Sequence, residues 1–221
     1  MKLSDINRHR KARTSPVKCI GFDADDTLWH NERFFKLTQE RFAELLAPHT
    51  DAPDLDAALM TAERRNLGHY GFGIKGFMLS MIETALEVTD NRVPGHVIAD
   101  LIATGQDMLQ HPIDLLPHAT EAVKAAKSYG PVLLITKGDL LHQEQKVAQS
   151  GLGDLFDGIE IVSDKQPHTY TRILDPFGGA HDGMMIGNSM KSDVRPLSDA
   201  VGHGALLPPH RAGRSGSSSA P

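Results

Sequence analysis

Five short apolar runs, separated by longer amphipathic segments, dominate the hydrophobic pattern of this chain. The runs are residues 17–22, 132–135, 158–162, 184–187 and 204–207. Runs of this length bounded by polar residues are typical of buried β-strands. One segment with helical periodicity lies before the second run, and one lies between each of the later runs. These segments are residues 118–129, 140–150, 167–174 and 194–201. Strands that alternate with helices predict an α/β fold with a parallel five-stranded sheet.

The long segment between the first and second runs, residues 31–111, has helical periodicity throughout. Its Leu, Phe, Met and Ile residues recur at spacings of three and four, and Pro53 and Pro94 mark helix boundaries. We therefore expect an all-helical cap over residues 31–111. It would be inserted into an α/β core made of residues 15–30 and 112–210.

The two ends of the chain differ in composition from the rest. Residues 1–14 carry five basic side chains and one acidic side chain, which predicts a basic flexible extension. Residues 211–221 are rich in Gly and Ser, which predicts a disordered tail.

Composition narrows the range of functions. The 221-residue chain has a formal net charge of -5, which argues against a general nucleic-acid binder. No apolar segment is long enough to span a bilayer, and the N-terminus lacks the apolar stretch of a secretion signal. The only cysteine, Cys19, cannot form an internal disulfide. We expect a cytoplasmic protein that binds neither nucleic acid nor membrane, with its oligomeric state left open.

The first predicted strand ends in the most informative segment of the chain, where Asp23, Asp25 and Thr27 follow one another at intervals of two. Carboxylates this close repel each other, and a bound divalent cation would offset their charge. One aspartate then suits attack on an electrophile, and the other suits proton transfer. A solvated acidic turn is the alternative interpretation of this segment taken alone.

Polar residues also follow three other predicted strands. They are Thr136 and Lys137 after the second, Lys165 after the third, and Asn188 and Asp193 after the fourth. A hydroxyl beside the backbone N–H groups of a helix start suits an anionic oxygen, and a lysine there neutralises carboxylate or phosphoryl charge. The Asn and Asp oxygens suit Mg²⁺, which binds few protein ligands and retains several waters.

In their order along the chain, these four segments resemble the motifs of the haloacid dehalogenase-like superfamily of phosphotransfer hydrolases, over residues 17–207. The resemblance implies a Rossmann-like sheet with strand order 3-2-1-4-5 and a helical type 1 cap. Ligands of such sheets bind beyond the carboxyl ends of the strands, where the strand order reverses. Asp23 and Asp193 are therefore expected to face each other across that point.

The resemblance also implies a role for each residue. Asp23 would be the nucleophile that forms an aspartyl-phosphate, and Asp25 would act as general acid and then general base. The other residues implied are Thr136 and Lys165, which would steady the phosphoryl oxygens, and Thr27, Lys137 and Lys75, which would bind substrate. The implied function is that of a phosphatase acting on a small phosphorylated metabolite.

The implied cofactor is Mg²⁺, held by Asp23, the backbone carbonyl of Asp25, Asp193 and Asn188. The fourth motif of the superfamily often begins with an acid, whereas this chain has Asn188. The amide removes one negative charge from the metal site, so we expect weaker metal binding, with Asp193 as a ligand and Asn188 as a nearby or water-mediated contact.

A glycine-rich segment, residues 71–76, fits the dinucleotide signature G-x-G-x-x-G. That fingerprint requires a preceding strand, whereas a helical segment precedes it here, so we reject nucleotide-cofactor binding. We expect instead a loop between cap helices that reaches over the active site, with Lys75 at the substrate. The twelve histidines show no metal-binding spacing, and only His30 is expected near the site.

Three alternatives stay open. A 2-haloacid dehalogenase on the same fold attacks carbon and needs neither a metal nor an acid at position 25, so the presence of Asp25 argues against it. A phosphomutase would pass the phosphoryl group to another hydroxyl if the cap excluded water. A non-catalytic binding protein is the third alternative, because a fold alone does not establish activity.

Overall fold

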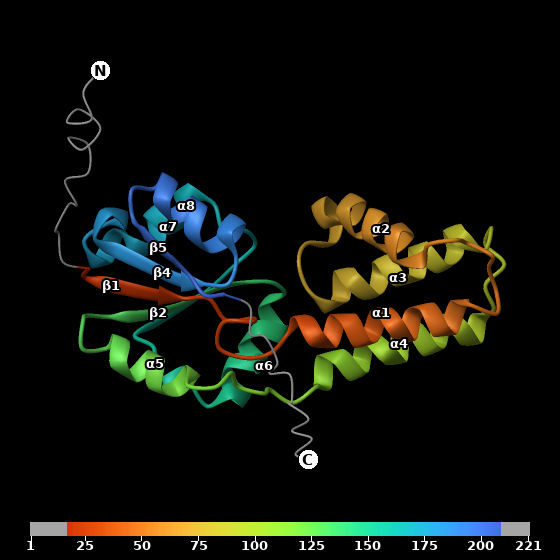
Figure 1. The fold of residues 1–221 in the computed structure, drawn as a ribbon, viewed down its shortest axis with the longest axis horizontal. Helices are drawn as coiled ribbons and strands as arrows, with labels where there is room; N and C mark the ends of the chain where they lie inside the picture. Colours follow the sequence, from red (N-terminus) through yellow and green to blue (C-terminus); the bar gives the residue numbers. More distant parts are fainter. Residues whose placement is uncertain (1–16, 209–221) are drawn as a thin grey trace, which may run out of the picture.

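The structure, a computed structural model, describes residues 17–208, in which a helical cap stands beyond one end of an α/β core (Figure 1). The core strands are β1 (Cys19–Phe22), β2 (Val132–Lys137), β3 (Gly158–Val162), β4 (Gly183–Gly187) and β5 (His203–Leu206). All neighbours pair in parallel in the order β3-β2-β1-β4-β5, which confirms the expected topology. The expected extension, residues 1–14, and the expected tail, residues 211–221, lie outside the described residues.

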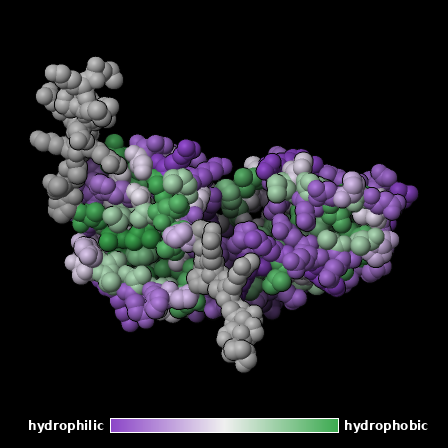
Figure 2. Space-filling view, in the orientation of Figure 1, coloured by the Kyte–Doolittle hydropathy of each residue, from purple (hydrophilic) through white to green (hydrophobic). Residues whose placement is uncertain are grey.

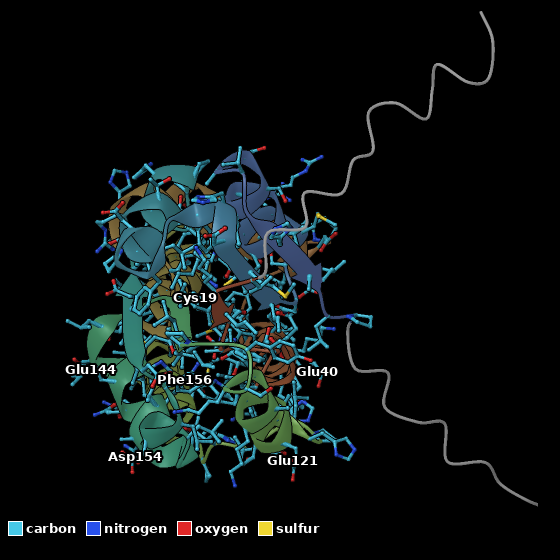
Figure 3. The ribbon with its side chains drawn as sticks, turned by 90° about the vertical axis from the view of Figure 1, so that its left-hand side faces the viewer. Cys19, Glu40, Glu121, Glu144, Asp154 and Phe156 are labelled. Carbon is cyan, nitrogen blue, oxygen red and sulfur yellow. The ribbon has the colours of Figure 1, made fainter. Side chains whose placement is uncertain are left out.

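Side chains of the strands alternate between the two faces of the sheet. Ile20 and Phe22 pack with α5 (Ala119–Ala126) and α6 (Leu140–Ser150). Cys19 packs with the opposite pair of helices, α7 (Pro167–Leu174) and α8 (Arg195–Asp199). Figure 3 shows Cys19 in the interior, whereas Glu121 and Asp154 lie at the outer edge. Because helices cover both faces, the central strands are apolar along their whole length.

The cap consists of four helices that fall within residues 31–111. They are α1 (Glu32–Leu46), α2 (Leu55–Tyr70), α3 (Ile74–Val88) and α4 (Gly95–Gln110). Their apolar faces meet around Phe42, Leu59, Met81 and Leu101, all fully buried. The chain passes from β1 into α1 and returns from α4 to α5, so the cap stands over the carboxyl end of the sheet (Figure 1). None of the helices in residues 17–208 is long and apolar enough to cross a membrane.

The segment after β4 differs from the single helix predicted over residues 194–201. The chain first makes a π-helical turn, Met190–Val194, and α8 spans only Arg195–Asp199. The N–H of Val194 donates to the carbonyl of Ser189 at 3.3 Å, five residues earlier. Single π-helical turns occur frequently at functional sites, and this one carries Asp193.

One face of the sheet is only partly covered. At the edge strand β5, Leu206 and the following Leu207 are 47% and 36% exposed. An apolar groove of about 970 Å³ runs between α5 and the neighbouring strands. Figure 2 shows hydrophobic residues gathered over the core in this view, whereas the cap surface is mainly hydrophilic. The C-terminal edge of the described core is therefore thinly covered.

Candidate active site

A cavity of about 380 Å³ lies between the core and the cap, at the carboxyl ends of the central strands. The core residues that line it include Asp23, Asp25, Thr136, Lys137, Lys165, Asn188 and Asp193, and the cap residues include Glu63, Asn66, Phe72 and Phe77. Asp23 follows β1 and Asp193 follows β4, the two strands between which the strand order reverses. This is where open α/β sheets bind their ligands.

Lys165 joins the two carboxylates at the core side of this cavity. Its Nζ lies 2.5 Å from Oδ1 of Asp23 and 2.7 Å from Oδ1 of Asp193. The distance between the two carboxylate oxygens therefore cannot exceed the sum of these two distances. The structure thus brings Asp23 and Asp193 together, as the resemblance implied. The Lys165 side chain is 1% exposed, so solvent screens the pairing little.

The electrostatics of this cluster are set by burial. Burial raises the pKa of Asp23, and the charge of Asp193 adds to the increase, while Lys165 opposes it. Burial alone would lower the pKa of Lys165, but the two carboxylates outweigh it and hold that pKa above its ordinary value. Two carboxylates against one ammonium leave a net negative charge, which a further cation would offset.

Backbone geometry holds Asp193 in place. Its Oδ2 accepts a hydrogen bond from the N–H of Ser189 at 2.9 Å. The hydroxyl of Tyr170, on α7, donates to the carbonyl of Ser192 at 2.9 Å and so fixes the same turn. A Cβ at Gly187 would overlap the Asp193 carboxylate. The glycine that ends β4 is therefore a steric requirement of the site.

Asp25 is held by three donors. Its Oδ1 accepts from Nε1 of Trp29 at 2.7 Å and from Nζ of Lys146 at 2.8 Å. Its Oδ2 accepts from Nε2 of Gln143 at 3.0 Å. Burial raises the pKa of Asp25, but the Lys146 charge and the three hydrogen bonds outweigh burial, so the pKa lies below its usual range. Asp25 is therefore ionised at neutral pH in this arrangement.

Thr27, expected to bind substrate, does not line the cavity but supports it from behind. Its hydroxyl donates to Oδ2 of Asp23 at 3.3 Å and accepts from the N–H of Asn188 at 3.1 Å. Thr27 is 5% exposed and does not line the cavity. Its hydroxyl therefore ties the loop after β1 to the loop after β4.

Thr136 and Lys137 end β2, and both line the cavity. The Lys137 ammonium contacts Oγ of Ser192 at 3.0 Å and lies 3.8 Å from the ring centroid of Phe72. Burial lowers the pKa of Lys137. Lys137 thus brings a second ammonium to the core side of the cavity, and an aromatic ring of the cap covers it.

Lys75 does not line the cavity, in contrast to its expected contact with substrate. Only residues 71–73 form the loop, and Lys75 lies in the first turn of α3. Its Nζ lies 3.0 Å from both carboxylate oxygens of Asp139, the N-cap residue of α6. Lys75 therefore links the cap to the core, while Phe72 and the other residues of this segment line the cavity.

Helix α6 contributes three cavity residues that the sequence interpretation missed, His142, Gln143 and Lys146. All three are buried, whereas His30, the histidine expected near the site, does not line the cavity. Burial, with the nearby Lys146 charge, lowers the pKa of His142 to about 4. The signal was present in the sequence, because these polar residues share one face of a core helix with the buried Val147.

The donor set fits Mg²⁺. Asp23 and Asp193 would offer carboxylates, and Asn188 and the Asp25 carbonyl would offer neutral oxygens, all hard ligands. Within residues 17–208, no three His, Cys, Asp or Glu side chains cluster in a way that would hold a metal. The site would therefore rest on two carboxylates, neutral oxygens and water, a ligand set that suits Mg²⁺.

Comparison with known proteins agrees with this geometry. A family model described as haloacid dehalogenase-like hydrolase matches residues 17–200. The crystal structure of a haloacid dehalogenase-like family hydrolase from Xanthomonas campestris is similar, with a TM-score of 0.83 and 44% identity, over 88% of this chain and 82% of that chain. A search of curated proteins gave no match.

Two more distant structures share the fold. One is a protein described as a HAD hydrolase, YfnB from Bacillus subtilis bound to magnesium, with a TM-score of 0.61, 14% identity and 86% of each chain covered. The other is a 2-haloacid dehalogenase from Pseudomonas syringae, with a TM-score of 0.59, 18% identity and 86% of each chain covered. From the family match and the 44% identity to the Xanthomonas structure, the chain belongs to the haloacid dehalogenase-like hydrolases.

Proposed function

We propose that this protein is a cytoplasmic, Mg²⁺-dependent phosphatase that hydrolyses a small phosphorylated metabolite. The observation that carries the proposal is the pair of carboxylates, Asp23 and Asp25, that line one cavity together with Lys137 and Lys165. A nucleophile and a second acid beside two ammonium groups suit the transfer of an anionic phosphoryl group. A cavity of about 380 Å³ suits a small substrate.

The residues of the chain would carry out two half-reactions. In the first, a carboxylate oxygen of Asp23 attacks phosphorus, the bond from phosphorus to the alcohol oxygen breaks, and Asp25 protonates that oxygen. In the second, Asp25 takes a proton from water, and the water oxygen attacks the same phosphorus. The bond to Asp23 then breaks, phosphate leaves, and both aspartates are restored. Because its pKa is lowered, Asp25 is ionised in the free protein, and it must take up a proton from solvent before the first half-reaction. The negative charge of a bound phosphate ester beside it favours that uptake.

The remaining residues would stabilise charge. Lys165 and Thr136 would hold the phosphoryl oxygens, and Lys137 would attract the anionic substrate. When bound by Asp23, Asp193 and their neighbours, Mg²⁺ supplies positive charge opposite the transferring group. The magnesium bound to YfnB, which shares the fold, supports this choice of metal.

The test is the release of phosphate from an aryl phosphate in the presence of Mg²⁺. Asp23→Asn should reduce the rate about 10³-fold or more, because the nucleophile is lost. Asp154→Asn is the matched control and should leave the rate unchanged, because Asp154 is exposed on the surface of the α/β unit. Phosphate release that survives Asp23→Asn would overturn the proposal. A panel of phosphorylated metabolites would then identify the substrate of the active protein.

A further inference from the structure

The side chain of Asp25 is fixed from outside its own loop. We propose that Lys146, on core helix α6, is a positioning residue that ties the Asp25 carboxylate to Asn31, the residue through which the chain enters the cap. The inference rests on the proposed function, which gives Asp25 its role in proton transfer. Its structural part, the link between Asp25 and the cap entry, can be measured separately.

The geometry of Lys146 supports this role. Its Nζ lies 2.8 Å from Oδ1 of Asp25 and 2.8 Å from Oδ1 of Asn31. Lys146 is 8% exposed, so its ammonium is desolvated and depends on these two oxygens. A lysine in this position loses a partner if either oxygen moves. The orientation of Asp25 and the position of the cap entry are therefore coupled through one ammonium group.

The Asn31 side chain lies at the edge of its helix and does not cap it, although Asn31 is also among the residues that line the cavity. It is the N-cap residue of α1, but its side chain makes no capping hydrogen bond. The capping role falls to Asp26, whose carboxylate accepts from the N–H groups of Asn31 and Glu32 at 2.9 Å. Within the described residues, the contact to Lys146 is the hydrogen bond that the Asn31 side chain makes. Removing this side chain therefore tests the contact without removing a helix cap.

Helix α6 meets the cap at two places. Near its start, Asp139 pairs with Lys75 of α3, and two turns later Lys146 pairs with Asn31. Gln143 lies between these two contacts, and Lys146 makes the second one. Both residues hold the Asp25 carboxylate. A shift of the cap relative to the core would therefore displace the Asp25 carboxylate through its contacts with α6. Glu144, by contrast, is exposed and lies at the outer edge of the molecule (Figure 3).

Trp29 makes the proposal measurable without turnover. It is the only tryptophan of the chain, and its Nε1 donates to Oδ1 of Asp25 at 2.7 Å. The full-length protein labelled with ¹⁵N will therefore give a single indole N–H cross-peak, which reports the position of Asp25. The variants to compare are Lys146→Met and Asn31→Ala. The control is Glu144→Met, which also removes one charge from α6.

We expect both variants to displace the indole cross-peak and the control to leave it in place. In the phosphatase assay, kcat of Lys146→Met should fall about 10- to 100-fold while KM stays within about threefold, because proton transfer and not binding is impaired. Asn31→Ala should lower kcat less, and it should add nothing to Lys146→Met, since both act through one contact. Thermal unfolding of each variant shows whether it is folded. If Lys146→Met does not fold, Asn31→Ala still tests the proposal, because Asn31 is partly exposed.

A cross-peak at the wild-type position in the folded variants would overturn the proposal, whether or not the protein releases phosphate. A displaced cross-peak with unchanged kcat would overturn it as well, because Asp25 would then work without Lys146. Wild-type protein that releases no phosphate would refute the proposed function alone. A displaced cross-peak in that case would still support the link from Lys146 to Asp25.

Discussion

The ammonium of Lys165 lies 2.7 Å from Oδ1 of Asp193, and both side chains are only 1% exposed. The same ammonium reaches Asp23, so one lysine balances two carboxylates that the ends of β1 and β4 bring together. Removal of one partner from a buried ion pair leaves an uncompensated charge and costs about 3–5 kcal/mol. The pairing thus stabilises the folded chain as well as supporting the proposed chemistry.

Lys165→Met is expected to lower the free energy of unfolding at pH 7 by about 3–5 kcal/mol and to abolish phosphate release. The difference from wild type should shrink as the pH falls, because protonation of Asp23, whose pKa burial already raises, removes one of the two facing charges. Urea titrations at pH 7 and pH 5 measure this. Lys124→Met, at an exposed position on α5, is the control. An equal loss of stability at both pH values would contradict the interpretation.

The stability of the wild-type protein should also depend on His142. Burial and the Lys146 charge lower the pKa of this histidine from 6.5 to about 4. Between these values the unfolded chain binds a proton that the folded chain does not. The stabilisation is therefore complete above pH 6.5 and is lost as the pH falls toward 4, in total about 3 kcal/mol.

His142→Gln should flatten this dependence, because the side chain no longer titrates. The measurement is the free energy of unfolding from urea titrations between pH 7 and pH 4, compared with wild type. The control is His168→Gln, at an exposed position on α7. A variant with the wild-type pH dependence would show that His142 is not the responsible group.

The core was predictable from the sequence because β1, β2 and β4 are formed by apolar runs and polar residues follow each of the first four strands. That pattern located Asp23, Thr136, Lys165 and Asp193 at strand ends, and the parallel topology then brought them to one edge of the sheet. Here local pattern and global fold agree, so the prediction needed no knowledge of individual contacts.

Thr27, Lys75 and Lys146 could not be placed in this way. The role of each depends on a partner far away in the sequence, respectively Asn188, Asp139 and Asp25. A threonine near the predicted nucleophile or a lysine in a cap segment fits either a substrate contact or a structural contact. Only the contacts in the folded protein decide between the two.

The ion pair between Lys75 and Asp139 should contribute little to stability. The two side chains are 48% and 28% exposed, and exposed pairs contribute about 0–1 kcal/mol. Lys75→Ala should therefore lower the free energy of unfolding by less than about 1 kcal/mol and keep KM for an aryl phosphate within about threefold.

Lys137→Ala is the matched comparison, because Lys137 lines the cavity and Lys75 does not. Loss of a charged contact to the substrate should raise KM about tenfold or more. Steady-state kinetics of the two variants on the same aryl phosphate measure the contrast. A larger increase in KM for Lys75→Ala than for Lys137→Ala would show that Lys75 reaches the substrate after all.

Removal of Mg²⁺ separates the phosphatase from the dehalogenase alternative. Phosphate release should stop in excess EDTA and return when Mg²⁺ is restored, because Asp23, Asp193 and Lys165 alone leave a net negative charge opposite an anionic substrate. Attack on the carbon of a 2-haloacid needs no metal and would continue in EDTA. The measurement is the release of phosphate from an aryl phosphate and of halide from a 2-haloacid, in parallel, with and without EDTA. Halide release that persists in EDTA, with no phosphate release under either condition, would assign the chain to dehalogenase chemistry.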